Sequence, residues 1–142
     1  MTAGEPANGL EAAIARLAEE IRKERVRSWR LLASIVDSSD DAIISKTADG
    51  VITSWNKAAE RIYGWTAEEA VGRPMDILFP PERLGEMDGI LRTVAAGGRV
   101  DHFVTARMTK DGREIWVSVT VSPVRDADDK VVGASSIARE LR

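Results

Sequence analysis

The stretch of sequence that decides the fold reads Asp49-Gly-Val-Ile-Thr-Ser-Trp-Asn-Lys-Ala-Ala-Glu-Arg-Ile-Tyr-Gly-Trp65. Its Asp-Gly pair lies between two β-rich runs, 42–47 and 51–55. Asp-Gly is a favoured two-residue hairpin turn because both positions tolerate a positive φ. After the second run, Asn56 can cap a short helix through hydrogen bonds from its first backbone N–H groups, and Gly64 can end that helix in a left-handed conformation. The stretch therefore predicts a strand, a turn, a second strand and a short helix.

Two more helices are predicted directly after this stretch. Thr66 and Glu69 form a capping box, in which the hydroxyl and the carboxylate satisfy backbone donors reciprocally, and Gly-Arg-Pro at 72–74 ends the helix that they start. Pro-Pro-Glu at 80–82 places a proline at the start of a longer helix, which we expect to end at the glycines 97–98. This helix is predicted to be the longest inside the domain.

The last third of the chain predicts three β-strands. The runs 101–109 and 114–122 flank an Asp-Gly turn, and a turn at 126–130 leads into the run 131–138. In the middle run, aliphatic side chains alternate with polar ones and Trp116, so the aliphatic face must meet the helices. Together with the first hairpin, these strands predict a five-stranded antiparallel sheet with helices on one face, which is an α+β fold.

The order of these motifs closely resembles that of PAS domains, in which a DGxIxxxN hairpin precedes AAExxxGY and a Thr-x-Glu-Glu helix. The corresponding places here hold Asp49, Gly50, Ile52, Asn56, Ala58, Ala59, Glu60, Gly64 and Trp65, then Thr66-Ala-Glu-Glu69. Three later segments of this chain also resemble PAS motifs in the same order: Gly72-Arg-Pro74, Lys110-Asp-Gly112 and Ser122-Pro-Val-Arg-Asp126. Each motif alone is common, but their joint order is specific, and it covers the chain from about Leu31 to Ile137. We therefore place a PAS domain at 37–138, and 139–142 as the start of a linker to an output domain.

The chain before this domain is predicted to be mostly helical. Residues 1–9 are small and polar and are interrupted by proline and glycine, which is typical of a disordered lead. In 10–36, apolar residues follow a four-three spacing that is typical of an amphipathic or coiled-coil helix, although the seam weakens at Glu24 and Ser28. We expect this helix to pack partly on its own domain and partly on a second copy. The candidate dimer-interface residues are Leu10, Ile14, Leu17, Ile21 and Leu31, with Trp116 from the outer face of the sheet.

Composition limits the classes of partner and compartment. With 142 residues, of which 44% are apolar, the chain can hold one domain and an extra helix. The net charge of −3 argues against a nucleic-acid-binding module, which normally carries a basic face. No apolar run approaches the length of about 18 residues that a membrane span needs, and the N-terminus lacks the regions of a signal peptide. We therefore expect this segment to be cytoplasmic and to contact neither nucleic acid nor a membrane.

The sequence offers few residues for catalysis or metal binding. Cysteine is absent, which excludes thiolate zinc sites and cysteine nucleophiles. The single histidine, His102, lies in a predicted strand, where a structural or surface role explains it. The acidic residues fall in turns and at helix starts, where capping and solubility explain them. We therefore predict neither an enzyme nor a metal site, and an α+β enzyme would require ionisable side chains that converge in a pocket.

The PAS resemblance implies a ligand pocket between the inner face of the sheet and the helices, and it implies several cofactor chemistries. Blue-light members use a cysteine that attacks flavin, and this chain has no cysteine, so that photochemistry is excluded. Haem-binding members place a histidine on the long helix, and 84–96 contains none, which argues against haem by that route and leaves open ligation by His102 or by a methionine such as Met87. Non-covalent flavin stays open because Trp55, Trp65, Trp116 and Tyr63 could stack on it, although core packing also explains these side chains.

Our candidates for the pocket lining combine apolar residues of the sheet and helices with two polar residues, and ordinary core packing also explains each of them. They are Ile44, Ile62, Leu78, Met87, Leu91, Phe103, Thr105, Val117, Val119 and Ser135.

Two functions from different classes follow from the resemblance. In the first, the chain is a sensor whose occupancy shifts the packing of a dimer and relays a signal to a linked output domain, such as a histidine kinase. In the second, it is a ligand-free module that dimerises and relays strain between neighbouring domains.

Overall fold

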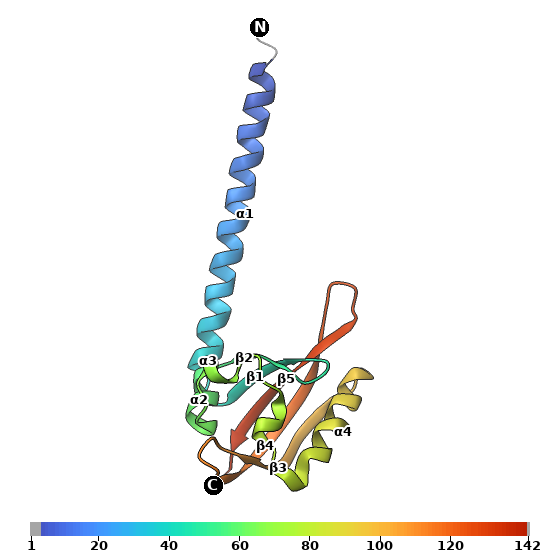
Figure 1. Ribbon diagram of the computed structural model, residues 1–142. Helices are drawn as coiled ribbons and strands as arrows, with labels where there is room; N and C mark the ends of the chain where they lie inside the picture. The colour runs from blue at the N-terminus through green and yellow to red at the C-terminus, as the bar shows by residue number, and fades with distance from the viewer. Residues whose placement is uncertain (1–3, 142) are drawn as a thin grey trace. The chain divides into compact units, whose positions relative to one another are not determined.

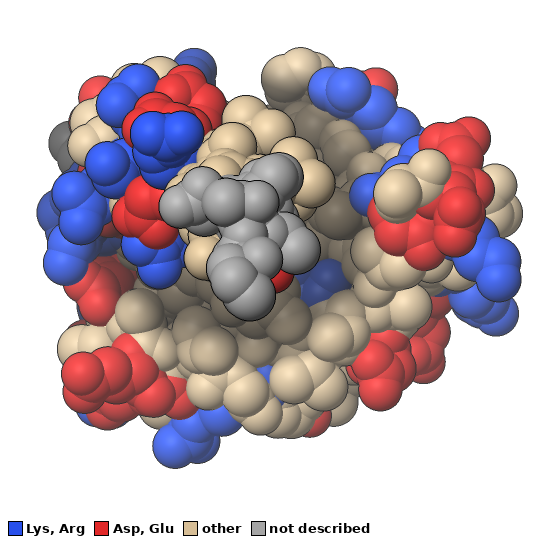
Figure 2. Space-filling model, turned by 90° about the horizontal axis from the view of Figure 1, so that it is seen from above, with Lys and Arg blue, Asp and Glu red and all other residues tan. Residues whose placement is uncertain are grey.

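The protein is described by a computed structural model that covers residues 4–141. The chain divides into two compact units, of which the first ends at Ile35 and the second begins at Val36. The second unit contains the sheet and all the shorter helices (Figure 1). Acidic and basic side chains are interspersed over the face that Figure 2 presents.

The first unit consists of helix α1, which spans Gly4–Ser38 and so continues across the unit boundary. It begins earlier than the expected start at Leu10. The proline at position 6 is compatible with this start because the first turn of a helix leaves its N–H groups unpaired in any case. Residues 1–3, the beginning of the expected lead, lie outside the described residues.

The second unit is built on a five-stranded antiparallel sheet, as predicted. Its strands are β1 (Ala42–Thr47), β2 (Ile52–Trp55), β3 (Val100–Met108), β4 (Glu114–Arg125) and β5 (Val131–Glu140). Their order in the sheet is β2-β1-β5-β4-β3, so the first and the last strands of the sequence lie side by side at its centre. Ile44 of β1 is registered with Ser136 of β5, which pairs in turn with Val121 of β4.

The first hairpin turns differently from the prediction. The N–H of Thr47 donates to the carbonyl of Val51 at 2.8 Å, and the N–H of Gly50 donates to the carbonyl of Thr47 at 3.0 Å. The loop therefore has three residues, and only Gly50 has a positive φ, +90°. The prediction of a two-residue turn was wrong because Asp-Gly also suits a type I turn that is followed by one left-handed residue. The same pattern of hydrogen bonds closes the hairpins at Thr109–Arg113 and Asp126–Lys130.

The two short helices after the first hairpin begin where their capping residues predict. Asn56 accepts a hydrogen bond from the N–H of Ala59, Thr66 and Glu69 complete the capping box, and Gly64 ends its helix at φ +85°. The helix expected to start at 80–82 differs, because this segment forms a 3₁₀ turn and the α-helix begins only at Leu84. The helical segments are α2 (Lys57–Tyr63), α3 (Ala67–Ala70), the 3₁₀ helices η1 (Met75–Leu78) and η2 (Pro81–Arg83), and α4 (Leu84–Ala95).

The side chain of Asn56 also joins three segments of the second unit. Its Oδ1 accepts from the N–H of Ile43 at 2.9 Å and from the N–H of Ala59 at 3.0 Å. Its Nδ2 donates to the carbonyls of Val36 at 2.8 Å and Asp41 at 3.1 Å. An amide side chain has two donor hydrogens and one acceptor oxygen with two lone pairs, so the hydrogen-bonding capacity of this buried group is fully used.

The hydrophobic core lies between the helices and the inner face of the sheet. Alternate residues of β4 are buried against the helices, as the pattern predicted, and Trp116 on the opposite face is 48% exposed. Tyr63, Ile44 and Leu78 are among the largest fully buried side chains. Residues two apart in a strand share a face, so Lys46, two positions after Ile44 in β1, also points into this layer.

Candidate functional site

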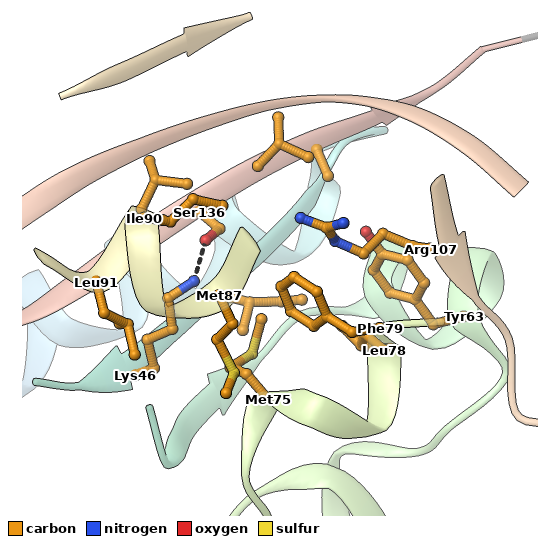
Figure 3. A pocket seen from close by; sticks show the side chains of 14 residues that line it. Lys46, Tyr63, Met75, Leu78, Phe79, Met87, Ile90, Leu91, Arg107 and Ser136 are labelled. Carbon is orange, nitrogen blue, oxygen red and sulfur yellow. Dashed lines mark hydrogen bonds between the residues drawn. The ribbon is translucent and has the colours of Figure 1, made fainter. Parts of the chain in front are cut away.

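A small cavity lies between α4, η1 and the inner face of the sheet. Its volume is about 20 Å³, which is enough for one water molecule. Strands β1, β4 and β5 provide its floor, and α4 and η1 provide much of its opposite wall (Figure 3). The lining consists of Ile44, Lys46, Tyr63, Met75, Leu78, Phe79, Met87, Ile90, Leu91, Arg107, Val119, Val121, Ser136 and Ala138.

Half of the residues predicted for the pocket are in this lining. Those that line it are Ile44, Leu78, Met87, Leu91 and Val119. The other five lie elsewhere. Val117 is fully buried in the core, Ile62 packs on the core from α2, and Phe103 is 37% exposed beside α4 in a separate shallow groove. Ser135 points to the opposite face from Ser136, because neighbouring residues of a strand alternate between faces.

The cavity also contains two cations that the sequence analysis missed, Lys46 and Arg107. Both lie in strands, and both are buried with less than a tenth of their surface exposed. The alternation rule could have located them, because Lys46 follows Ile44 by two positions and Arg107 follows Thr105 by two. Neither was predicted for the lining, because charged side chains are rarely buried.

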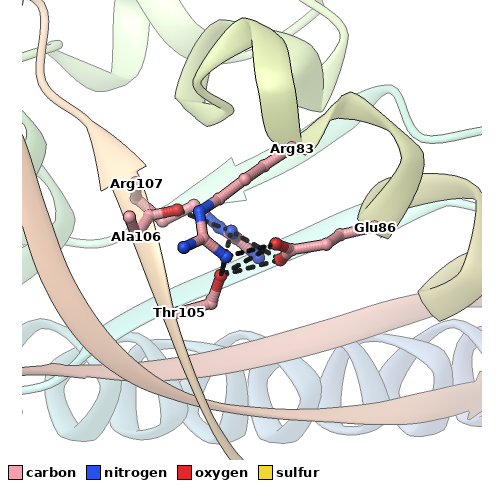
Figure 4. A network of polar contacts seen from close by, with 5 residues as sticks. All are labelled: Arg83, Glu86, Thr105, Ala106 and Arg107. Atoms are coloured by element: carbon pink, nitrogen blue, oxygen red, sulfur yellow. Dashed lines mark hydrogen bonds and ion pairs between the residues drawn. The ribbon is translucent and has the colours of Figure 1, made fainter.

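Arg107 belongs to a closed polar network around Glu86 (Figure 4). Its Nη1 lies 3.3 Å from Glu86 Oε1 and donates to the carbonyl of Ala106 at 2.9 Å. Arg83 Nη1 donates to Glu86 Oε2 at 2.8 Å, and the hydroxyl of Thr105 donates to Glu86 Oε1 at 2.8 Å. The network explains why Thr105, a candidate for the pocket lining, is buried but does not reach the cavity.

Electrostatics in this network favour the charged form of Glu86 in spite of burial. Burial raises the pKa of Glu86, but hydrogen bonds from Arg83, Thr105 and Arg107 outweigh it and hold the pKa below its usual range. Burial lowers the pKa of Arg107, and the contact with Glu86 opposes this effect. The guanidinium of Arg107 also lies 3.9 Å from the centre of the Phe79 ring, which adds a cation–π contact.

Lys46 has a much poorer environment. Its Nζ donates to the hydroxyl of Ser136 at 2.5 Å (Figure 3), and none of the ion pairs among residues 4–141 includes it. Burial and, to a smaller extent, the charge of Arg107 lower the pKa of Lys46 to about 8. Burial also raises the pKa of Tyr63, which lies beside Arg107 at the other end of the cavity, to about 12. The cavity therefore combines an apolar lining with one cation that no carboxylate neutralises.

Ser136 and Lys46 are residue types that serve as nucleophile and base in some hydrolases, so ionisable groups do converge here. Acyl transfer also needs N–H donors that stabilise an oxyanion. Ser136 lies in β5, whose backbone pairs with β1 on one side and with β4 on the other, so this strand offers no free row of N–H groups. The arrangement suits binding rather than acyl transfer.

The lining does not fit the cofactors considered from the sequence. It contains no histidine for haem, although Met87 lines it, and its volume is far below the roughly 300 Å³ of a typical small-molecule site. None of the three tryptophans considered for flavin lines it, although Tyr63 and Phe79 do. The absence of cysteine from the whole chain excludes the cysteinyl-flavin reaction. Within residues 4–141, no group of three or more His, Cys, Asp or Glu side chains could hold a metal ion.

The candidate dimer-interface residues are all exposed in the single chain. Leu10, Ile14, Leu17, Ile21 and Leu31 of α1 are between 49% and 63% exposed. Trp116 lies on the outer face of the sheet, where Arg83 approaches within 5.3 Å of its ring centre. Their role in a dimer stays a prediction. Among the described residues, no helix is long and apolar enough to cross a bilayer.

Comparison with known proteins agrees with this fold. The family model of the PAS fold matches residues 30–141. The signal transduction histidine-protein kinase AtoS of Escherichia coli (strain K12) is 28% identical over 134 residues, which are 93% of this chain and 21% of that protein. A PAS domain of Colwellia psychrerythraea superposes with a TM-score of 0.73 at 27% identity, covering 80% of this chain and 96% of that domain. An RNA-binding light-oxygen-voltage receptor superposes with a TM-score of 0.68 at 24% identity, covering 78% of this chain and 32% of that receptor, which shows the fold alone.

The chain therefore belongs to the PAS family, and the resemblance of its motifs is confirmed. It is homologous to part of a signalling histidine kinase. It spans about a fifth of that kinase's length.

Proposed function

We propose that this chain is the sensory PAS domain of a cytoplasmic signalling protein, in which a small molecule binds in the cavity and a dimer relays the signal to an output domain such as a histidine kinase. The observation that carries this proposal is the unneutralised Lys46 ammonium in an otherwise apolar cavity. A buried cation without a carboxylate partner costs stability, and a ligand can provide the missing interactions.

Helix α4 is suited to respond to a ligand. Val94 is its only buried residue among the described ones, and Met87, Ile90 and Leu91 are half-buried where they meet the cavity. Gly85 and Gly89 lie on this helix in open surroundings, where a Cβ atom would meet nothing within 4 Å. Glycine within a helix lowers its intrinsic stability by about 1 kcal/mol relative to alanine. The Glu86 network holds the first turn of α4, and the part of the helix beyond it meets the cavity through half-buried residues, so a ligand can bias the position of that part.

Helix α1 is the proposed dimer contact and output path. Its apolar residues at the four-three positions are exposed in the monomer, and such a seam is normally covered by a second helix. Asn56 connects β1 and the start of α2 to the carbonyl of Val36 near the end of α1, so a change inside the second unit has a hydrogen-bonded route to this helix. The relation to a histidine kinase supports a linked output domain.

Sedimentation tests the dimer part of the proposal. The double substitution Leu17→Glu with Ile21→Glu places charges in the seam, and we expect it to lower the dimer fraction strongly. The matched control, Ala12→Glu with Ala15→Glu, adds the same charge off the seam and is expected to leave the dimer intact. An unchanged dimer in the seam variant removes α1 from the interface.

The small volume of the cavity favours a second candidate, a ligand-free dimerisation and relay module. In that case Lys46 is a structural residue and no small molecule accompanies the purified protein. Native mass spectrometry of the protein as isolated separates the two functions, because a bound mass supports the sensor.

A further inference from the structure

The charges around the cavity do not balance. Lys46 and Arg107 line the cavity, and no acidic residue is in its lining. Arg83 lies outside the lining and is also stabilised by the charges of Glu82 and Glu114. Glu86 is the carboxylate that forms ion pairs with the two arginines. Both arginines use this carboxylate, and Lys46 does not. The lining of the cavity therefore has an excess of one positive charge, that of the Lys46 ammonium. Such an excess attracts an anion.

Lys46 cannot obtain the carboxylate of Glu86 without disrupting the network. Both oxygens of Glu86 already accept hydrogen bonds, Oε1 from Thr105 and Arg107 and Oε2 from Arg83 and Thr105. Removing either arginine from this partner would leave a guanidinium without a carboxylate. The negative charge that would neutralise Lys46 must therefore come from outside the chain's own network.

The geometry around Lys46 selects the kind of anion. An ammonium has three N–H donors, and Lys46 directs one of them to Ser136 Oγ. The hydroxyl of Ser136 accepts this bond, and its own hydrogen remains able to donate. A remaining ammonium N–H and this hydroxyl together form a two-donor site that matches the two oxygens of a carboxylate. A planar carboxylate is also smaller than a tetrahedral phosphate, which suits the confined space.

The surroundings of this pair select the rest of the molecule. Met75, Met87, Ile90 and Leu91 line the cavity near Lys46 (Figure 3). Methionine is flexible and polarisable, so it can rearrange around an incoming apolar group. Because α4 carries Met87, Ile90 and Leu91, a small outward movement of this helix would enlarge the cavity from the volume of a water molecule toward that of a short chain.

We infer that Lys46 and Ser136 bind the carboxylate of a small organic acid whose short apolar chain lies against Met75, Met87 and Leu91. The inference rests on the proposed sensor function and names its ligand class. The acid neutralises the buried ammonium, and its chain separates α4 from the sheet.

Calorimetric titration of the 142-residue chain with straight-chain acids tests this inference. The probes are propionate, hexanoate and octanoate, with hexanamide as the uncharged isostere of hexanoate. We expect hexanoate to bind at least tenfold more tightly than hexanamide, because an ion pair with hydrogen bonds contributes more than a neutral hydrogen bond. Equal binding of the acid and the amide would overturn the inference, and so would inorganic phosphate that binds as tightly as hexanoate.

Substitutions locate the site. Lys46→Met retains an unbranched, flexible side chain but removes the terminal ammonium, and we expect at least a tenfold loss of hexanoate affinity. Ser136→Ala is expected to weaken hexanoate about fivefold, which corresponds to one lost hydrogen bond. Lys130→Met, at an exposed lysine of the last hairpin, is the charge-matched control and is expected to bind hexanoate as the unsubstituted chain does. Unchanged affinity in Lys46→Met would overturn the inference, and thermal unfolding of each variant verifies that it is folded.

The carboxylate titrations, together with native mass spectrometry of the purified protein, also distinguish failure of this inference from failure of the sensor function. A neutral molecule that co-purifies with the protein, with no binding of carboxylates, overturns the ligand class and leaves the sensor function in place. No binding of any carboxylate, together with no co-purified mass, overturns both and favours the ligand-free relay.

Discussion

The two buried cations of the cavity, Arg107 and Lys46, differ in how fully their charges are satisfied. Arg107 has a carboxylate, a threonine hydroxyl, a backbone carbonyl and an aromatic ring within contact distance. Lys46 has one serine hydroxyl. Both side chains leave the inner face of the same sheet, so burial alone does not explain the difference. Arg107 has the environment of a structural residue, and Lys46 has that of a residue whose partner arrives from outside.

The largest predicted effect concerns the satisfied cation. Glu86→Gln removes the charge that Arg107 and Arg83 share, and we expect the free energy of unfolding to fall by about 3 kcal/mol, because a buried arginine is left without its carboxylate. Chemical denaturation at neutral pH measures this change. Glu82→Gln, at an exposed position in the adjacent η2, is the control and should change stability by less than about 0.5 kcal/mol. Equal effects of the two substitutions would show that the Glu86 network is not structural.

The opposite sign is predicted for the unsatisfied cation. The lowering of the Lys46 pKa from 10.5 to about 8 corresponds to an unfavourable burial free energy of roughly 3 kcal/mol. Lys46→Met relieves it, but it also removes the hydrogen bond to Ser136, so we expect a net stabilisation of about 2 kcal/mol at pH 7. Denaturation without added ligand measures it. A loss of stability in Lys46→Met would remove the contrast between the two cations.

The same contrast predicts a pH dependence. Because the pKa of Lys46 is lower in the folded state, the unfolded chain binds more protons between pH 8 and 10.5, and stability rises with pH in that window. The raised pKa of Tyr63 acts in the other direction above pH 10, where the unfolded chain begins to lose the phenolic proton. We therefore expect unfolding free energy to increase by about 1 to 2 kcal/mol from pH 8 to 10 in the unsubstituted chain. In Lys46→Met this increase should be absent, and an identical rise in both proteins would assign it to another group.

The smallest predicted effect is within the Glu86 network. Thr105→Val keeps the shape of the side chain but removes the hydroxyl that donates to Glu86 and accepts from Arg83. We expect a loss of about 1 kcal/mol in unfolding free energy, and Thr105→Ser should recover part of it. Thermal unfolding of the two variants measures the difference. No difference between valine and serine would mean that the hydroxyl contributes nothing to the network.

Local sequence signals predicted the strands, the helix caps and the face of β4 because each depends on residues that are close in the chain. Asn56, Gly64 and the Thr66–Glu69 capping box are examples, because each acts on backbone groups a few residues away. Strand order could not be predicted in this way, since the pairing of Ile44 with Ser136 joins the two ends of the domain. The three-residue hairpin loops were missed because the same Asp-Gly pair suits two loop lengths.

The cavity was predicted only in its apolar part. Ile44, Leu91 and Val119 were identified because hydropathy and alternation agree at those positions. At Lys46 and Arg107 the two signals conflict, because alternation with Ile44 and Thr105 favours the inner face whereas a charged side chain favours solvent. Such a conflict between local pattern and burial is expected at functional sites more often than elsewhere. A charged residue at an inward-facing position of a predicted strand is therefore a candidate site residue.

The most direct test of the central claim is the pKa of Lys46, measured by NMR from the chemical shift of its Cε atom during a pH titration, with and without hexanoate. Lys46→Met identifies the resonance. We predict a pKa of about 8 in the free protein, because the ammonium is buried without a carboxylate, and a clear increase when hexanoate is bound. A pKa near 10.5 in the free protein, or a low pKa that hexanoate leaves unchanged, would contradict the claim that Lys46 awaits an anionic ligand.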